Sequence, residues 1–156
     1  MSTAEPGPSS TAPYRAFLKP IVFVVDDDIS IRESLELLIV HAGFRAELFA
    51  SAEEFLARPR PRCPCCLVLD VHLPDVHGLD LQKRISDERP TMPIIFITGH
   101  GDIPTSVQAM KAGAVEFLTK PFAHEALSDA IRSAIERSRV SLEEEASLRA
   151  LRERNE

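Results

Sequence analysis

The sequence predicts an α/β fold in which a doubly wound, five-stranded parallel sheet is covered by helices on both faces. Five short apolar runs, rich in β-branched and aromatic residues, indicate strands that are buried on both sides. A segment with helical spacing of apolar residues follows each run. Strands and helices that alternate in this way form right-handed βαβ units, and such units build a parallel sheet.

The first strand is expected at residues 21–25, where the run IVFVV is continuous and apolar. A helix follows, with Ser30 and Glu33 matching a capping box at its start and Gly43 ending it. The other strands are expected at residues 44–49, 65–71, 94–98 and 115–119. The other helices are expected at residues 51–56, with Ser51 and Glu54 as a second capping box, at 78–88, at 104–112 and from 123 onwards.

Two terminal segments lie outside this pattern. Residues 1–18 are rich in Ser, Thr, Pro and Gly, and too poor in apolar residues to offset their ordering entropy, so a disordered tail is expected. Residues 139–156 contain strong helix formers of mixed charge, which predicts that the last helix continues as a linker. Its apolar stripe is broken, so a solvated helix and a weak parallel coiled coil both remain open.

Composition narrows the functional classes. The chain has 156 residues, of which 44% are hydrophobic and 27% charged, values close to those of ordinary globular domains. A net charge of −6 argues against binding of nucleic acid or an anionic membrane by this segment itself. No apolar run has the length of a membrane span, and the first residues do not form a signal peptide. We therefore expect a cytoplasmic protein with no membrane contact.

Three cysteines lie close together in the run CPCC, at Cys63, Cys65 and Cys66. An odd and crowded set indicates reduced thiols in a loop that leads into a buried strand. The alternative is half of a zinc site, but the sequence has no second cysteine pair to complete it.

Polar residues stand where the predicted strands end. Asp26 and Asp27 follow the first strand, Asp70 lies near the end of the third, Thr98 closes the fourth and Lys120 follows the fifth. In an open parallel sheet the functional site lies beyond the carboxyl ends of the strands. Each residue alone is most simply part of a surface turn; their shared position at one edge indicates a site.

The chemistry of this set points to phosphoryl transfer. Three converging carboxylates repel one another unless a cation is bound, and oxygen ligands of this kind suit Mg²⁺. Lysine and threonine supply a positive charge and a hydroxyl donor, both suited to a phosphoryl group. A carboxylate that attacks phosphorus forms an aspartyl phosphate. Asp70 is therefore the candidate acceptor.

The motifs VVDDD, LVLDVHLPDVHG, ITGHGD and FLTKPF, in this order and spacing, resemble the receiver domain of two-component response regulators. The resemblance covers about residues 19–138, and the run GHGDIPTSVQAMKAGAVEFLTKPF is similar to the FixJ type. It implies a flavodoxin-like sheet with strand order 2-1-3-4-5. It also implies a bacterial signalling switch that accepts a phosphoryl group from a sensor histidine kinase, and not a turnover enzyme.

For the metal, the resemblance implies an acidic pocket in which Asp26 and Asp27 hold Mg²⁺ together with Asp70 and the backbone carbonyl of His72. Asp28 is left outside this pocket. His72, His77 and His100 all fall on loops at the same edge, which leaves a transition-metal site as an alternative to solvated side chains.

For the phosphate, the resemblance implies that Thr98 and Lys120 bind the phosphoryl oxygens and that the Lys120–Pro121 peptide bond is cis. Phe117 matches the aromatic switch position, whose ring turns inward when Thr98 moves towards the phosphate. A phenylalanine there is equally compatible with an ordinary strand core.

FixJ-type proteins usually carry a DNA-binding domain after the receiver, so we expect an output domain beyond residue 156 and contact with DNA only through it. Phosphorylation is expected to favour a homodimer through the surface of the fourth helix, fifth strand and fifth helix. A stand-alone receiver that relays phosphate or binds a partner is the alternative. An Mg²⁺-dependent phosphatase and a receiver that is never phosphorylated are weaker ones.

Overall fold

The computed structural model describes residues 19–99 and 103–154. Its five strands are β1 (Ile21–Val25), β2 (Arg45–Phe49), β3 (Cys65–Asp70), β4 (Ile94–Thr98) and β5 (Glu116–Thr119). They pair in parallel in the order β2-β1-β3-β4-β5, which confirms the predicted fold. Its helices are α2 (Ile29–His41), α3 (Ala52–Leu56), α4 (Gly78–Glu88), α5 (Ile103–Lys111) and α6 (His124–Arg154). The predicted ranges differ from these by one or two residues at some ends.

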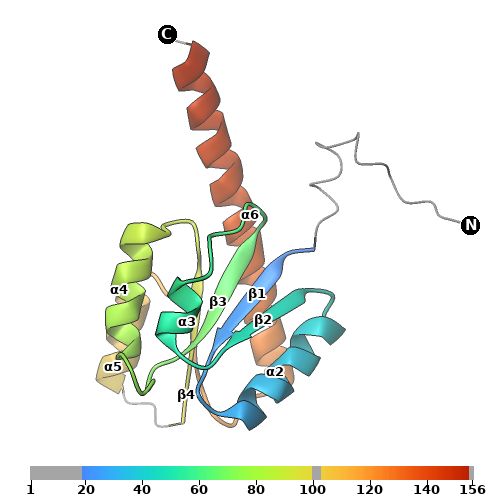
Figure 1. Cartoon of the computed structure of the whole chain (residues 1–156), viewed down its shortest axis with the longest axis vertical. Helices are drawn as coiled ribbons and strands as arrows, with labels where there is room; N and C mark the ends of the chain where they lie inside the picture. The colour runs from blue at the N-terminus through green and yellow to red at the C-terminus, as the bar shows by residue number, and fades with distance from the viewer. Residues whose placement is uncertain (1–18, 100–102, 155–156) are drawn as a thin grey trace, which may run out of the picture.

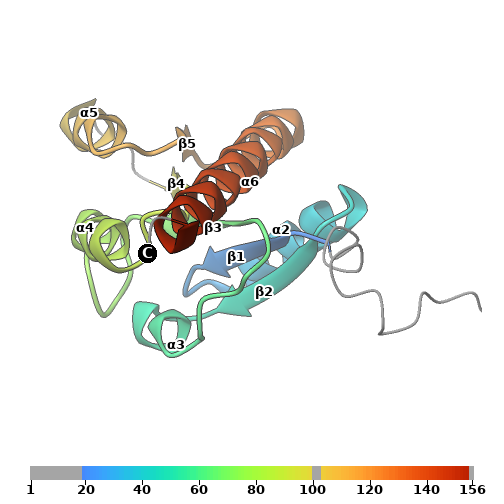
Figure 2. The same cartoon turned by 90° about the horizontal axis from the view of Figure 1, so that it is seen from above.

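The helices form two layers, one on each face of the sheet. Helices α3, α4 and α5 cover one face, and α2 and α6 cover the other (Figures 1 and 2). Two apolar cores result. The first includes the fully buried rings of Phe23, Phe55 and Phe96, and the second includes Leu35 and Ile131. Because β1, β3 and β4 are buried along their whole length, their carboxyl ends are held rigidly at one edge.

The first predicted capping box is wrong. Helix α2 begins at Ile29 with Asp28 as its N-cap, and the Asp28 carboxylate accepts hydrogen bonds from the backbone N–H groups of Ser30 (2.8 Å) and Ile31 (3.4 Å). Ser30 already lies inside the first turn, so its hydroxyl cannot cap it. The second prediction is closer, since the Ser51 hydroxyl accepts from the Glu54 N–H at 3.2 Å.

Gly78 brings the start of α4 against the end of β3. Its backbone N–H donates to the Val71 carbonyl at 2.7 Å. A Cβ atom at residue 78 would lie 2.8 Å from the Val71 Cα and 3.1 Å from the Phe96 ring, so a side chain does not fit. The glycine therefore keeps the β3–α4 loop short and close to the functional edge.

Helix α6 is continuous and has two environments. Its first half packs on the sheet and buries Leu127, Ile131 and Ile135. Its second half leaves the sheet, as Figure 1 shows. The two halves meet near Ser138, whose buried hydroxyl accepts a hydrogen bond from the Cys65 N–H at 3.0 Å. None of the helices in the described segments is long and apolar enough to cross a lipid bilayer.

Candidate functional site

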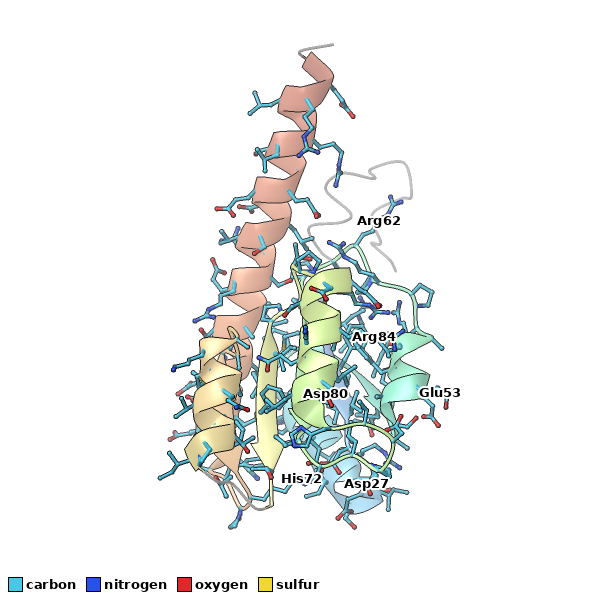
Figure 3. All side chains as sticks on the ribbon, turned by 90° about the vertical axis from the view of Figure 1, so that its left-hand side faces the viewer. Asp27, Glu53, Arg62, His72, Asp80 and Arg84 are labelled. Atoms are coloured by element: carbon cyan, nitrogen blue, oxygen red, sulfur yellow. The ribbon has the colours of Figure 1, made fainter. Side chains whose placement is uncertain are left out.

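Three carboxylates meet at the carboxyl edge of the sheet. Asp26 follows β1 and is completely buried, Asp70 ends β3 and is 6% exposed, and Asp27 is exposed. One carboxylate oxygen from each lies within 4.8 Å of the others. Asp28 is not part of this cluster; its carboxylate caps α2 instead. Figure 3 shows Asp27 and His72 at this edge of the sheet, with Arg62 towards the other edge.

Lys120 is the cation that faces these acids. Its Nζ lies 3.0 Å from Asp26 Oδ2 and 3.4 Å from Asp70 Oδ2. It follows β5, and its backbone N–H donates to the Thr98 carbonyl at 2.7 Å, which ties the lysine to the end of β4. The Lys120–Pro121 peptide bond is cis, as predicted.

The charges of the cluster do not balance. Burial raises the pKa of Asp26, and repulsion from Asp70 adds to this, while hydrogen bonds from the Asp28 N–H and Lys120 act in the opposite direction. For Lys120, burial favours the neutral amine, but the contacts with Asp26 and Asp70 outweigh it and raise its pKa. Three acids thus share one firmly protonated lysine. An all-oxygen donor set with excess negative charge fits a hard divalent cation such as Mg²⁺.

Backbone contacts orient the two buried acids. Asp26 Oδ1 accepts from the Asp28 N–H and Asp70 Oδ1 accepts from the His72 N–H, both at 2.9 Å. Each acid therefore uses one oxygen for the turn that follows its strand and presents the other to Lys120.

The residues predicted on the fourth and fifth strands lie beside this cluster. Thr98 is the last residue of β4, is completely buried and pairs in register with Thr119, the residue before Lys120. Phe117 lies two residues before Thr119 on β5 and pairs with Phe96. The two ring centroids are 6.0 Å apart, and Phe117 packs partly buried against the first core.

Sequence reasoning missed Arg32. From the first turn of α2, its Nη1 donates to the Asp26 backbone carbonyl at 2.7 Å. The contact fixes the turn after β1 without reaching the carboxylates. An arginine six residues after Asp26 has no distinctive spacing, and no motif identifies it.

The structure gives little support to a metal site at the loop histidines or at the cysteines. The rings of His72 and His77 lie 5.9 Å apart, and His77 Nδ1 accepts from the Leu79 N–H as the N-cap of α4. His100 lies outside the described residues. The three cysteines are free and buried, and burial raises the pKa of Cys65 to about 12. Within residues 19–99 and 103–154, the carboxylate cluster is the one group of three or more potential metal ligands.

The model of the response regulator receiver domain family matches residues 22–132. The chain belongs to this family. Receiver domains are phosphorylation-dependent signalling modules that work with sensor histidine kinases, often dimerise and generally bind Mg²⁺ at an acidic pocket. In this receiver domain, Asp26, Asp27 and Asp70 form an acidic cluster.

Individual relatives support the assignment. The receiver domain is 49% identical over 137 residues to Nodulation protein W of Bradyrhizobium diazoefficiens, covering 88% of this chain and 60% of that protein. It is 42% identical over 125 residues to Transcriptional regulatory protein FixJ of the same organism, covering 80% of this chain and 61% of that protein. The solved structure of response regulator StyR is 46% identical with a TM-score of 0.80, covering 86% of this chain and 68% of that one. The chain thus spans about three-fifths of the two curated relatives.

Proposed function

We propose that this receiver domain stores a signal as a phosphoryl group on Asp70. The observation that carries the proposal is the position of Asp70. It is a buried carboxylate with one oxygen fixed by the His72 N–H and the other 3.4 Å from Lys120 Nζ, beside two further acids. Few structural roles need that many carboxylates around one lysine.

In the proposed reaction, the free oxygen of Asp70 attacks the phosphorus of a phosphohistidine on a sensor kinase. An O–P bond forms, the P–N bond breaks, and the electron pair leaves with the imidazole, which takes up a proton. Asp26, Asp27, Asp70 and the His72 carbonyl would hold Mg²⁺, which neutralises charge on the phosphoryl oxygens when bound. Lys120 contributes a fixed positive charge on the other side.

The signal would leave the site through Thr98 and Phe117. The Thr98 hydroxyl is proposed to bind a phosphoryl oxygen, and the Phe117 ring to fill the space that Thr98 leaves. In the register of β4 and β5, Thr98 pairs with Thr119 and Phe117 lies two residues before Thr119. Because side chains two residues apart share a face of a strand, Phe117 is near enough to Thr98 to support this coupling. Phosphorylation then shifts the balance between two conformations.

Acetyl phosphate labelling in the presence of Mg²⁺ tests the acceptor. We expect about one phosphoryl group per wild-type chain, slow hydrolysis, and no labelling of Asp70→Asn. Asp28→Asn removes a neighbouring acid that caps α2 and should be labelled normally. Equal labelling of wild type and Asp70→Asn would reject the assignment, and rapid turnover of phosphomonoesters would favour a phosphatase instead.

The proposed homodimer uses the surface of α5, β5 and α6. Helix α5 exposes three large apolar side chains on this side, Ile103 (78% exposed), Val107 (43%) and Met110 (44%). We expect beryllofluoride with Mg²⁺ to double the sedimenting mass of the wild type, and Ile103→Glu to prevent it. An unchanged mass of the wild type would contradict dimerisation.

The proposed setting is the bacterial cytoplasm. Because the relatives include a transcriptional regulatory protein, we propose that α6 transmits the phosphorylation state to a DNA-binding output domain. Relay of the phosphate by a stand-alone receiver is the second candidate. Reporter transcription in cells that express wild type or Asp70→Asn separates the two, since a relay has no direct effect on a promoter.

A further inference from the structure

Helix α3 is too short to be stable without outside support. It has five residues, and isolated helices of this length do not form in water. Its first N–H groups need acceptors, and the Ser51 hydroxyl supplies one for Glu54. The other two acceptors come from a distant segment. The Asp75 carboxylate accepts hydrogen bonds from the N–H groups of Ala52 (3.4 Å) and Glu53 (3.1 Å).

The opposite end of α3 is held as firmly. The Arg89 side chain, 8% exposed, donates from Nη2 to the carbonyls of Leu56 (3.4 Å) and Arg58 (2.7 Å). Its guanidinium carbon also lies 4.9 Å from the centroid of the Phe55 ring, which is itself completely buried. Helix α3 is therefore held in place at both ends, and the segment that contains Asp75 is attached to it.

Asp75 belongs to the loop between β3 and α4, which also carries His72. The two ends of the loop are joined by an isolated antiparallel β-bridge between the backbones of His72 and His77. The hydrogen bond from the Gly78 N–H to the Val71 carbonyl closes it further. Val76 packs against the first core and sets the depth of the loop. Fewer contacts hold the loop against movement between α3 and α4, because a cleft of about 450 Å³ lies between these helices beside the loop. Figure 3 shows Glu53 and Asp80 on these two helices.

We propose that Asp75 is a positioning residue for the phosphorylation site. Its hydrogen bonds join the loop to α3 within the lining of the cleft, and in this role they keep the loop where the His72 carbonyl can reach the metal pocket. The proposal rests on the proposed function, since the His72 carbonyl acts there as a metal ligand. Loss of Asp75 should weaken Mg²⁺ binding even though Asp26, Asp27 and Asp70 are untouched.

The alternative is that Asp75 only caps a short helix. That role lowers the stability of the fold but leaves the metal pocket of the folded protein unchanged. Asp80 provides the matched control, because its carboxylate lines the same cleft and takes part in none of the side-chain hydrogen bonds or ion pairs of the described residues. A charge effect on Mg²⁺ would act through both acids, whereas positioning acts through Asp75 alone.

The experiment uses the 156-residue chain, its Asp75→Ala, Asp75→Asn and Asp80→Ala variants, and calorimetric titration with MgCl₂ alone. We expect Asp75→Ala to raise the Mg²⁺ Kd about fivefold, as for the loss of one capping contact. Asp75→Asn keeps an acceptor oxygen and should recover part of the affinity, and Asp80→Ala should match wild type. Acetyl phosphate labelling of Asp75→Ala should be slow at low Mg²⁺ and approach the wild-type rate at saturation.

Equal Mg²⁺ affinities for Asp75→Ala and Asp80→Ala would overturn the proposal, even if Asp75→Ala lowers the stability of the fold in urea. A Mg²⁺ affinity of Asp75→Asn as weak as that of Asp75→Ala would also count against it. Failure of the wild-type chain to label at Asp70 would reject the proposed function alone, because the Mg²⁺ titration tests Asp75 independently of phosphorylation.

Discussion

The carboxyl and amino edges of the sheet both gather charge, of opposite sign and with opposite results. At the carboxyl edge, three acids face Lys120, and burial raises the pKa of Asp26. Towards the amino edge lies an arginine group, Arg58, Arg60 and Arg89, and each member has partners. Arg58 makes two 2.8 Å hydrogen bonds to Glu47, while Arg60 contacts Thr91 (2.8 Å) and Glu145 (3.2 Å).

The arginine group and the carboxylate cluster differ in how far their charges are paired within the chain. The arginines contact carboxylates, carbonyl groups and aromatic rings of the same chain, although Arg89 Nη1 is buried without a hydrogen-bond partner. Most of this charge is therefore used internally. The three carboxylates face the single positive charge of Lys120, so negative charge is in excess. Their repulsion lowers the stability of the metal-free protein. A charged cluster with its partners supplied holds the fold together, and one without them is ready to bind a ligand.

The largest expected effect is at the arginine group. Arg89→Ala leaves the carbonyls of Leu56 and Arg58 without their donor and removes the contact with the Phe55 ring. We expect a loss of about 2–3 kcal/mol in the free energy of unfolding, measured with urea. Arg84→Ala removes an exposed pair with Glu88 and should cost less than about 0.5 kcal/mol. Equal losses in the two variants would contradict the structural role of Arg89.

At the carboxyl edge the sign reverses. We expect Asp26→Asn to raise the free energy of unfolding at pH 7 without Mg²⁺, because it removes one of the repelling buried charges. Because the pKa of Asp26 is raised on folding, the folded state binds this proton more tightly. The free energy of unfolding of the wild type therefore falls as the pH rises from the pKa of Asp26 in the unfolded chain through its higher pKa in the folded protein. In acid, where Asp26 is protonated in both states, the advantage of the variant disappears. Saturating Mg²⁺ should reverse the order, and a variant less stable than wild type without Mg²⁺ would contradict the charge argument.

The smallest expected effect tests the link between the arginine group and α6. Arg60 and Glu145 are both about one-third exposed, so their ion pair is worth little. Arg60→Ala should lower the free energy of unfolding by less than about 0.5 kcal/mol. Hydrogen exchange of residues 142–149 should increase, because this pair ties the outer half of α6 to the loop before β3. Unchanged exchange would show that the outer half does not depend on this contact.

The sequence predicted what local patterns control. Apolar runs gave the strands, alternation with helices gave the parallel sheet, and the ends of the strands gave Asp26, Asp27, Asp70, Thr98 and Lys120. The roles of these residues in phosphorylation remain predictions. His72 was proposed through its carbonyl, and the structure adds that its N–H orients Asp70.

Long-range contacts of polar side chains with the backbone were not predictable. Asp75 reaches α3 across 22 and 23 residues, and Arg89 reaches its carbonyls across 31 and 33. Such contacts have no sequence period, because they depend on where the fold brings two loops together. The wrong cap at Ser30 has a local cause, since Asp28 and Ser30 are both good N-caps and the first helical residue decides between them.

The continuity of α6 makes it a lever. Its inner half is fixed in the second core, and no break separates that half from the outer one. At about 1.5 Å per residue, residues 139–154 extend roughly 24 Å, so a tilt of about 10° at the base moves the tip by roughly 4 Å. A tilt of α6 on the sheet would therefore move its outer end by more than the length of a hydrogen bond.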